Sequence, residues 1–101
     1  MTRRIKLSEA ALADLRSAAA WYEHHRAGWG DVFLVAVEAA LQKIRRSPER
    51  FPIADEPVRR ALLRRFPYGV FYVTEEDRID VIAIIHSSRD PETWRRRIEG
   101  P

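Results

Sequence analysis

The segment HSSRDPETWRRR, residues 86–97, brings together side-chain types that could act on a charged substrate. A histidine titrates near neutrality, so His86 could serve as a general acid or base; otherwise it is hydrogen-bonded at the rim of a sheet. The guanidinium of Arg89 can hold a phosphate or a carboxylate through two parallel hydrogen bonds. We predict that His86 and Arg89 are candidates for catalysis, and that Arg89 is also a candidate for target binding.

The same segment carries the start of a helix. Aspartate accepts hydrogen bonds from the first N–H groups of a helix and proline fits the first helical position, so Asp90 and Pro91 predict that a short helix begins here. This interpretation removes Asp90 from the candidate catalytic carboxylates. On that helix, Trp94 either stacks on a base or anchors the helix to the sheet, and Arg95 either contacts the target or lies on a solvated face. We predict Trp94 and Arg95 as target-binding residues.

Four arginines crowd the segment 58–66. Side chains alternate along a regular strand, so Arg60 and Arg64 share one face and Arg59 and Arg65 share the other. Two explanations stay open: the charges protect an edge strand from pairing with another chain, or one face carries an arginine toward the candidates described above. On the second explanation Arg64 is a candidate for catalysis and target binding, and Arg60 for target binding.

The first half of the chain predicts a short strand and two long helices. Residues 3–7 alternate weakly, and Ser8 stands where it can cap the helix that follows. Apolar residues then recur at helical spacing from Glu9 to His25. Two glycines within 27–31 predict a tight reversal, and a second helix follows until Ser47, which precedes a proline. Two long helices joined by a short turn form a helical hairpin.

The second half predicts a sheet. Residues 47–57 are expected to be an extended connection, and strands are expected at 58–66, 69–74 and 79–86. Short links imply antiparallel neighbours. The last strand is apolar on both faces, which marks an interior strand, whereas the arginines suit the first to a sheet edge. The expected fold is α+β in one domain, 1–101: an N-terminal strand, a helical hairpin on a mainly antiparallel sheet of three to four strands, and a short C-terminal helix.

Composition excludes several kinds of site. The chain of 101 residues has no cysteine, so it offers neither a thiolate ligand nor a thiol nucleophile. It has neither a Cys/His metal spacing nor a glycine-rich phosphate loop, and we expect no metal and no cofactor. We also expect a cytoplasmic protein without membrane contact, because no signal peptide or membrane-spanning apolar run is found. The net charge of +3 permits nucleic acid or an acidic protein as a partner and requires neither.

Two segments carry a family resemblance: RRFPYGVFY at 64–72 and VIAIIHSSRDPETWRRR at 81–97. Together with the predicted hairpin and strand order, they make nearly the whole chain similar to the RelE/ParE superfamily of bacterial type II toxin-antitoxin toxins. The resemblance implies a growth-inhibiting toxin, held inactive by a cognate antitoxin whose C-terminal segment wraps it, and it allows a higher-order toxin-antitoxin complex. Such a peptide would also cover the second apolar face of the last strand.

Members of this superfamily differ in their target. ParE-like members act on DNA gyrase without catalysis by the toxin, and the long hairpin with WYEHHRAGWG at its turn resembles theirs. RelE-like members cut mRNA on the ribosome, and Arg64 and Arg89 stand where their phosphate-binding arginines are expected. The chain's only two lysines lie outside the strands expected between residues 58 and 86, however, and Trp94 or Arg95 stands near the position of their catalytic tyrosine. We therefore favour a gyrase poison, with a ribosome-dependent endoribonuclease as the alternative.

Overall fold

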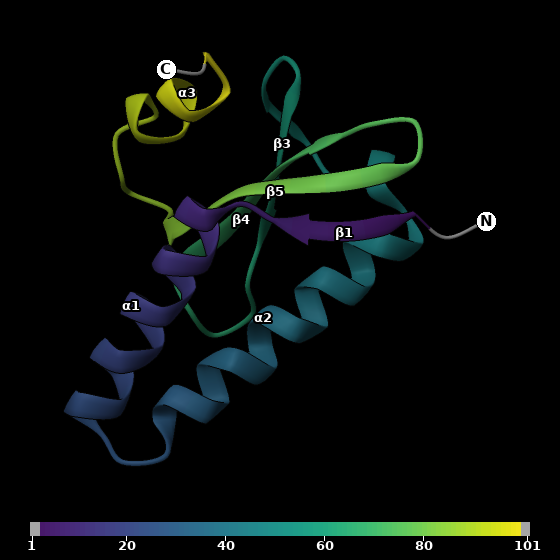
Figure 1. Ribbon diagram of the computed structural model, residues 1–101. Coiled ribbons are helices and arrows are strands. Elements are labelled where there is room, and N and C mark those ends of the chain that lie inside the picture. Colours follow the sequence, from purple (N-terminus) through teal and green to yellow (C-terminus); the bar gives the residue numbers. More distant parts are fainter. Residues whose placement is uncertain (1–2, 100–101) are drawn as a thin grey trace.

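A short strand, β1 (Arg4–Leu7), leads into a hairpin of two long helices, α1 (Glu9–His25) and α2 (Trp29–Arg46) (Figure 1). The computed structural model describes residues 3–99. Ser8 caps α1 as predicted, because its Oγ accepts a hydrogen bond from an N–H of the first turn at 3.0 Å. Ser47 is the C-cap of α2, directly before the proline that cannot continue the helix.

The turn between the helices is organised by one carboxylate. Glu23 accepts hydrogen bonds at 3.0 Å from the N–H groups of Gly28 and Gly30. Gly28 has a φ of +90°, a conformation that L side chains rarely adopt. At Gly30 a Cβ would lie 2.9 Å from the carbonyl oxygen of Ala19, so the missing side chain lets the two helices approach closely. The turn therefore requires glycine at Gly28 for its positive φ and at Gly30 for the close approach of the two helices.

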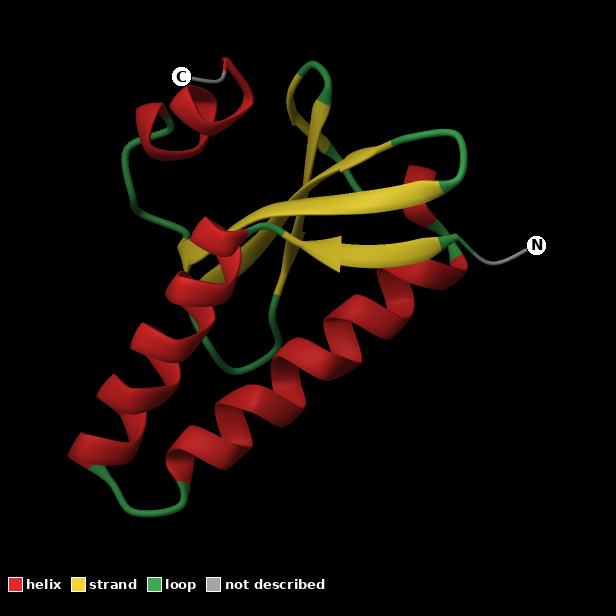
Figure 2. Ribbon diagram, viewed as in Figure 1, coloured by secondary structure: helices red, strands yellow, loops and turns green. Residues whose placement is uncertain are grey.

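After a short 3₁₀ turn, η1 (Pro48–Arg50), the chain forms four more strands, drawn in yellow in Figure 2. They are β2 (Ile53–Asp55), β3 (Val58–Leu62), β4 (Tyr68–Thr74) and β5 (Arg78–His86). Within residues 3–99 the sheet has the order β1-β5-β4-β3-β2. The β2–β3, β3–β4 and β4–β5 pairs are antiparallel, and β1 lies parallel to β5. The predicted α+β fold is confirmed.

Three details of the predicted sheet are wrong. The sheet has five strands rather than three to four, because part of the expected connection pairs with β3 as β2. Strand β3 ends at Leu62 instead of residue 66, and Arg65 has a φ of 72°, which a strand cannot contain. β3 is also not an edge strand, since β2 lies outside it. Edge protection therefore does not explain the arginines of β3.

The helical hairpin covers one face of the sheet and the main core lies between them. Phe33, Val37 and Ile44 from α2 are buried there against Val70 and Tyr72 from β4. The buried phenol of Tyr72 donates a 2.6 Å hydrogen bond to the carbonyl of Pro48, which ties η1 to the sheet. Burial raises the pKa of this phenol to about 12.

A second, smaller core lies on the opposite face under the short helix α3 (Glu92–Glu99) (Figure 1). Trp94 is 3% exposed and its ring stacks on Phe71 with centroids 5.4 Å apart. Val58, Ala83 and Ile85 belong to the same cluster. The chain itself therefore supplies cover for the second face of β5, which was expected to be covered by the bound antitoxin peptide.

Candidate functional site

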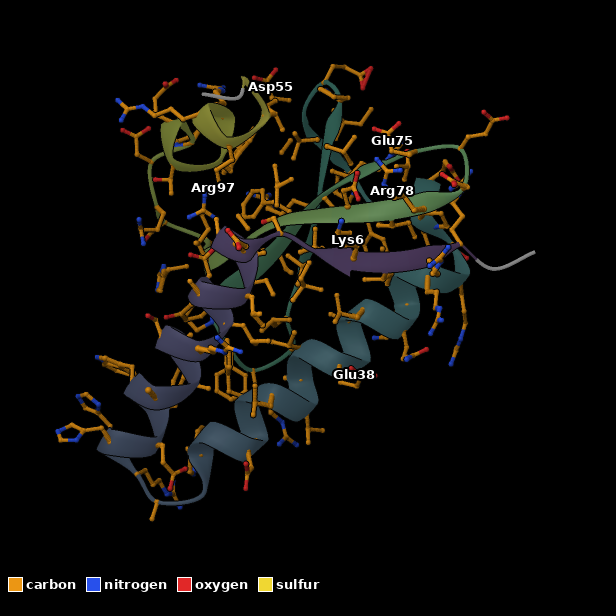
Figure 3. The ribbon with its side chains drawn as sticks, in the orientation of Figure 1. Lys6, Glu38, Asp55, Glu75, Arg78 and Arg97 are labelled. Carbon is orange, nitrogen blue, oxygen red and sulfur yellow. The ribbon has the colours of Figure 1, made fainter. Side chains whose placement is uncertain are left out.

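The loop from β5 to α3 holds the candidate residues, and α3 is fixed at both ends. At its start, the Asp90 carboxylate accepts a hydrogen bond from the N–H of Glu92 at 3.0 Å, which confirms the predicted cap. Toward its end, Arg97 projects to α1 and forms an ion pair with Asp14 at 2.6 Å (Figure 3). The loop residues Ser87, Ser88 and Arg89 are thus held between two anchored elements.

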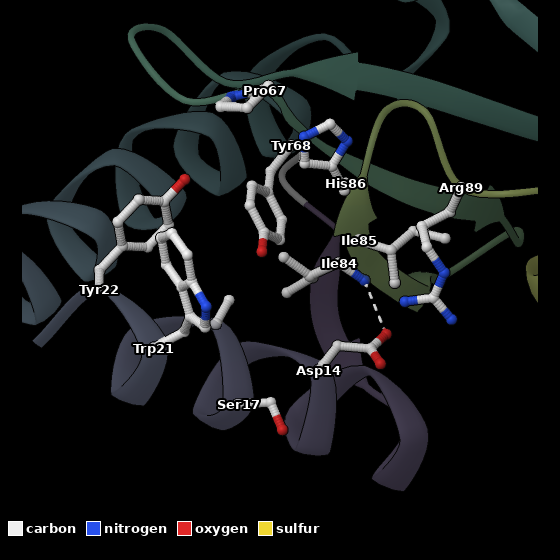
Figure 4. A pocket seen from close by; sticks show the side chains of 11 residues that line it. Asp14, Ser17, Trp21, Tyr22, Pro67, Tyr68, Ile84, Ile85, His86 and Arg89 are labelled. Carbon is white, nitrogen blue, oxygen red and sulfur yellow. Dashed lines mark hydrogen bonds between the residues drawn. The ribbon is translucent and has the colours of Figure 1, made fainter. Parts of the chain in front are cut away.

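A pocket of about 610 Å³ lies between α1, the start of β4 and the end of β5 (Figure 4). Its walls combine aromatic rings with hydrogen-bond donors. They are formed by Asp14, Ser17, Ala18, Trp21, Tyr22, Pro67, Tyr68, Ile84, Ile85, His86 and Arg89. We call this the α1 pocket. Its size is that of an ordinary ligand or peptide-anchoring cleft.

The hydrogen bonds of His86 define which of its two ring nitrogens is left to donate. Its Nδ1 accepts from the N–H of Ser88 at 3.1 Å and lies 2.7 Å from the Ser88 hydroxyl. An Nδ1 that accepts leaves the proton of the neutral ring on Nε2. The edge of the ring also contacts Tyr68, with centroids 5.5 Å apart. In its neutral form His86 is therefore arranged to donate a hydrogen bond, which suits ligand binding better than proton abstraction.

A second hollow, of about 230 Å³, lies on the other side of Arg89 under α3. Arg60, Arg89 and Arg95 all line it, together with Ser87, Phe71 and the edge of Trp94. We call it the arginine hollow. Arg95 is held in place by Asp55 at 2.9 Å, and this hydrogen bond raises the pKa of Arg95. Three guanidinium groups around one hollow are chemically able to hold an anion, although Arg95 already pairs with both Asp55 and Glu92.

Arg64 does not join this arrangement. It is exposed in the turn after β3 and lines a third hollow, beside Lys43 of α2. In a continuous strand the alternation of side chains would place Arg64 on the same face as Arg60, but β3 already ends at Leu62. The prediction that Arg64 lies with Arg89 and His86 in one site is therefore wrong.

Trp94 is also corrected as a target-binding residue. Its ring is buried in the second core, so it can support the arginine hollow but cannot present its face to a partner in this conformation. Of the sequence-predicted residues, the structure brings Arg60, Arg89 and Arg95 to one hollow, and Arg89 and His86 to another.

Sequence reasoning missed the contribution of α1 to the site. Trp21 is 53% exposed and stands beside Tyr22 at the mouth of the α1 pocket. Burial, together with the neighbouring phenol of Tyr68, raises the pKa of Tyr22. The signal in the sequence was the adjacent pair Trp21-Tyr22: on a helix with one buried face, two neighbouring aromatics cannot both face the core.

Among residues 3–99, no group of three or more histidine, aspartate or glutamate side chains is arranged to hold a metal ion. None of the helices there is both long and apolar enough to cross a bilayer.

A helical hairpin packed on a mainly antiparallel sheet is the architecture that the resemblance to the RelE/ParE superfamily implies. Residues 5–91 match the family model described as ParE toxin of type II toxin-antitoxin system, parDE, and the chain belongs to that family. Toxin ParE2 of Mycobacterium tuberculosis, in the CDC 1551 / Oshkosh and H37Rv strains, is 29% identical over 101 residues, covering 99% of this chain and 96% of the relative.

A solved structure shares the fold. It is titled chromosomal ParDE TA system from P. aeruginosa, and its matching chain has a TM-score of 0.64 at 19% identity. The match covers 84% of this chain and 96% of that one. The superfamily resemblance of the two sequence segments is thereby confirmed, on the ParE side.

Proposed function

We propose that this ParE-family toxin inhibits growth by binding DNA gyrase, with Arg89 and the arginine hollow as the contact surface. The observation that carries the proposal is the composition of that hollow. Three arginines and a serine are its polar lining, and the remaining lining side chains are apolar. Guanidinium groups are protonated at all physiological pH values, so this surface can grip carboxylates or phosphates but supplies no general base. Grip without proton transfer suits a binding poison.

A cognate antitoxin is part of the same proposal. The family model is named for a toxin-antitoxin pair, and the solved relative is titled as a ParDE system. We infer that an antitoxin encoded next to this toxin neutralises it, in a complex that could contain several copies of each chain. Co-expression of that neighbouring product should restore growth, and an unrelated antitoxin should not.

The alternative, a ribosome-dependent endoribonuclease, has one observation in its favour. His86 and Arg89 line the same α1 pocket, so a proton donor and a phosphate-binding group are near one another. Either target would place the action of the toxin in the cytoplasm. Either also agrees with the expectation that residues 1–101 make up one toxin domain.

Gyrase supercoiling and mRNA cleavage on ribosomes, measured side by side with purified protein, separate the two. We expect inhibited supercoiling or trapped cleaved DNA, and intact mRNA. Arg89→Ala and Arg60→Ala should each weaken gyrase inhibition by about tenfold or more, as for charged residues at the centre of an interface. Arg4→Ala, an exposed arginine on β1, is the matched control and should leave inhibition unchanged. Cleaved mRNA with normal supercoiling would support the alternative, and no response in either assay would remove both targets.

A further inference from the structure

The outward side of α2 carries an apolar strip that the fold does not cover. Val32, Val35 and Ala39 follow one another at helical spacing on the side turned away from the sheet. Val35 is 69% exposed and Val32 is 36% exposed, while Phe33 and Val37 on the opposite side are buried. Exposed apolar side chains that follow one another along a helix form a contiguous patch, which a partner surface can cover.

A hollow of about 110 Å³ lies directly beside the strip. Ala36, Ala39 and Leu62 line it, and Leu62 at the end of β3 is 56% exposed. Small residues on a helix let another helix approach closely, and the leucine forms a raised rim on the other side. The strip and the hollow share Ala39, so they make one continuous surface with an exposed valine beside a recess. This is the hollow that Arg64 lines; its lining is mainly apolar, with Lys43 and Arg64 as its charged members.

The two ends of α2 differ in charge, with an acidic residue in the first turn and basic residues in the last, while Glu38 lies near the middle of the helix. Asp31 lies in the first turn, and Glu38 follows two turns later with its carboxylate accepting from Gln42 at 3.0 Å (Figure 3). Lys43, Arg45 and Arg46 occupy the last turn. A second α2 laid alongside in the same direction would place like charges together. One laid in the opposite direction would place the acidic end of each helix beside the basic end of the other.

We propose that a second copy of this chain docks on this surface, with the two α2 helices antiparallel about a two-fold axis near Val35 and Ala39. In this arrangement Val35 of each copy enters the hollow beside Ala39 of the other. Asp31 of each copy lies near the basic end of the second copy, within reach of Arg46. An isologous contact uses the same patch on both chains, which is what a self-complementary strip and hollow provide.

The size of the surface sets the strength of the dimer. A single helix strip is smaller than the roughly 800 Å² per partner of a stable interface, so the dimer is reversible and its formation depends on protein concentration. The α1 pocket and the arginine hollow lie on other parts of the molecule, and they stay open in such a dimer. The dimer proposal can therefore be tested independently of the proposal that the toxin binds gyrase.

Sedimentation of the purified full chain from about 1 μM to about 1 mM tests the dimer. We expect a monomer at the low end and a dimer at the high end. Val35→Asp should raise the dimer dissociation constant by about tenfold or more, because it places a charge in an apolar contact on both copies. Ala20→Asp on the exposed side of α1 is the matched control and should change nothing, with circular dichroism confirming that both variants are folded.

A charge swap tests the antiparallel direction. Asp31→Lys and Arg46→Glu should each weaken the dimer, since each sets like charges against one another. An equimolar mixture of the two variants should dimerise again, and so should the double variant D31K/R46E. A monomer at all concentrations overturns the proposal and leaves the strip to another partner. A dimer that Val35→Asp does not weaken, or one that the double variant does not restore, overturns the α2 geometry.

Discussion

Asp14 of α1 and Arg97 of α3 together close the edge of β5. One carboxylate oxygen of Asp14 accepts from the N–H of Ile84 at 3.0 Å and from the Arg97 guanidinium at 2.6 Å. Arg97 in turn donates to the carbonyl of Ile82 at 2.8 Å. Strand β1 pairs with β5 only as far as Val81, so these two side chains satisfy backbone groups that the sheet leaves open.

Asp14→Ala is expected to destabilise the fold by about 2–3 kcal/mol, because it leaves a guanidinium and a partly buried N–H without their acceptor. Asp14→Asn retains an oxygen for the N–H of Ile84 and should cost only about 1 kcal/mol. Urea unfolding measures both. The control is Asp77→Ala, an exposed carboxylate 3.9 Å from Arg78, which should stay within about 0.5 kcal/mol of the parent. Equal stability of Asp14→Ala and the control would contradict the role given to this pair.

Trp94→Ala is expected to lose about 3–5 kcal/mol, since it removes the largest side chain of the second core. The matched control is Trp21→Ala, at an exposed tryptophan, which should cost less than about 1 kcal/mol. Thermal unfolding followed by circular dichroism distinguishes the two. If Trp94→Ala kept its stability and lost only its toxicity, Trp94 would be a target contact after all.

Tyr72→Phe is expected to lose about 1–2 kcal/mol, because the carbonyl of Pro48 is left without its donor. Burial raises the pKa of Tyr72 to about 12 in the folded chain, above the ordinary value of a tyrosine, so the native state holds its proton more tightly. The folded state gains its full stabilisation from this phenol at pH values below the pKa of Tyr72 in the unfolded chain. This stabilisation is lost as the pH rises through the pKa of Tyr72 in the folded chain.

Urea unfolding of the parent and of Tyr72→Phe at a series of alkaline pH values measures this slope. The parent should lose stability between the two pKa values more steeply than the variant. Tyr68→Phe leaves the hydrogen bond to Pro48 in place and should keep the part of the slope that belongs to Tyr72. Parallel curves for parent and Tyr72→Phe would show that this phenol does not govern alkaline unfolding.

Glu23→Gln is expected to weaken the hairpin turn. Hydrogen bonds from the N–H groups of Gly28 and Gly30 lower the pKa of Glu23 below the ordinary value of a glutamate. Because the pKa of Glu23 is lower in the folded chain than in the unfolded chain, its carboxylate stabilises the fold at pH values above the unfolded-state pKa. This stabilisation is lost as the pH falls through the folded-state pKa. The melting temperature of the parent should therefore fall more than that of Glu23→Gln between neutral and acid pH. Glu75→Gln, in the β4–β5 turn, should follow the parent.

Local signals in the sequence were sufficient for most elements of the fold. Ser8, Ser47 and Asp90 mark helix ends because caps and prolines act within a few residues, through the backbone groups that every helix leaves open. The apolar run of β5 identified it as an interior strand. The family resemblance rests on the same stretch and was confirmed by comparison with known toxins.

Only the tertiary structure decided how the site is assembled. Arg64 does not lie with the other candidates, because β3 ends at Leu62 and side chains beyond it no longer alternate between the two faces of the sheet. The residue types around Leu62 gave no sign that the strand would end there. Asp14 and Arg97 are 83 positions apart, and a contact over that separation depends on how α1 and α3 pack on the sheet. The sequence by itself determined the elements and the residue types available for binding. Packing determined which of them share a pocket, because a side chain's neighbours in space are set by the whole fold.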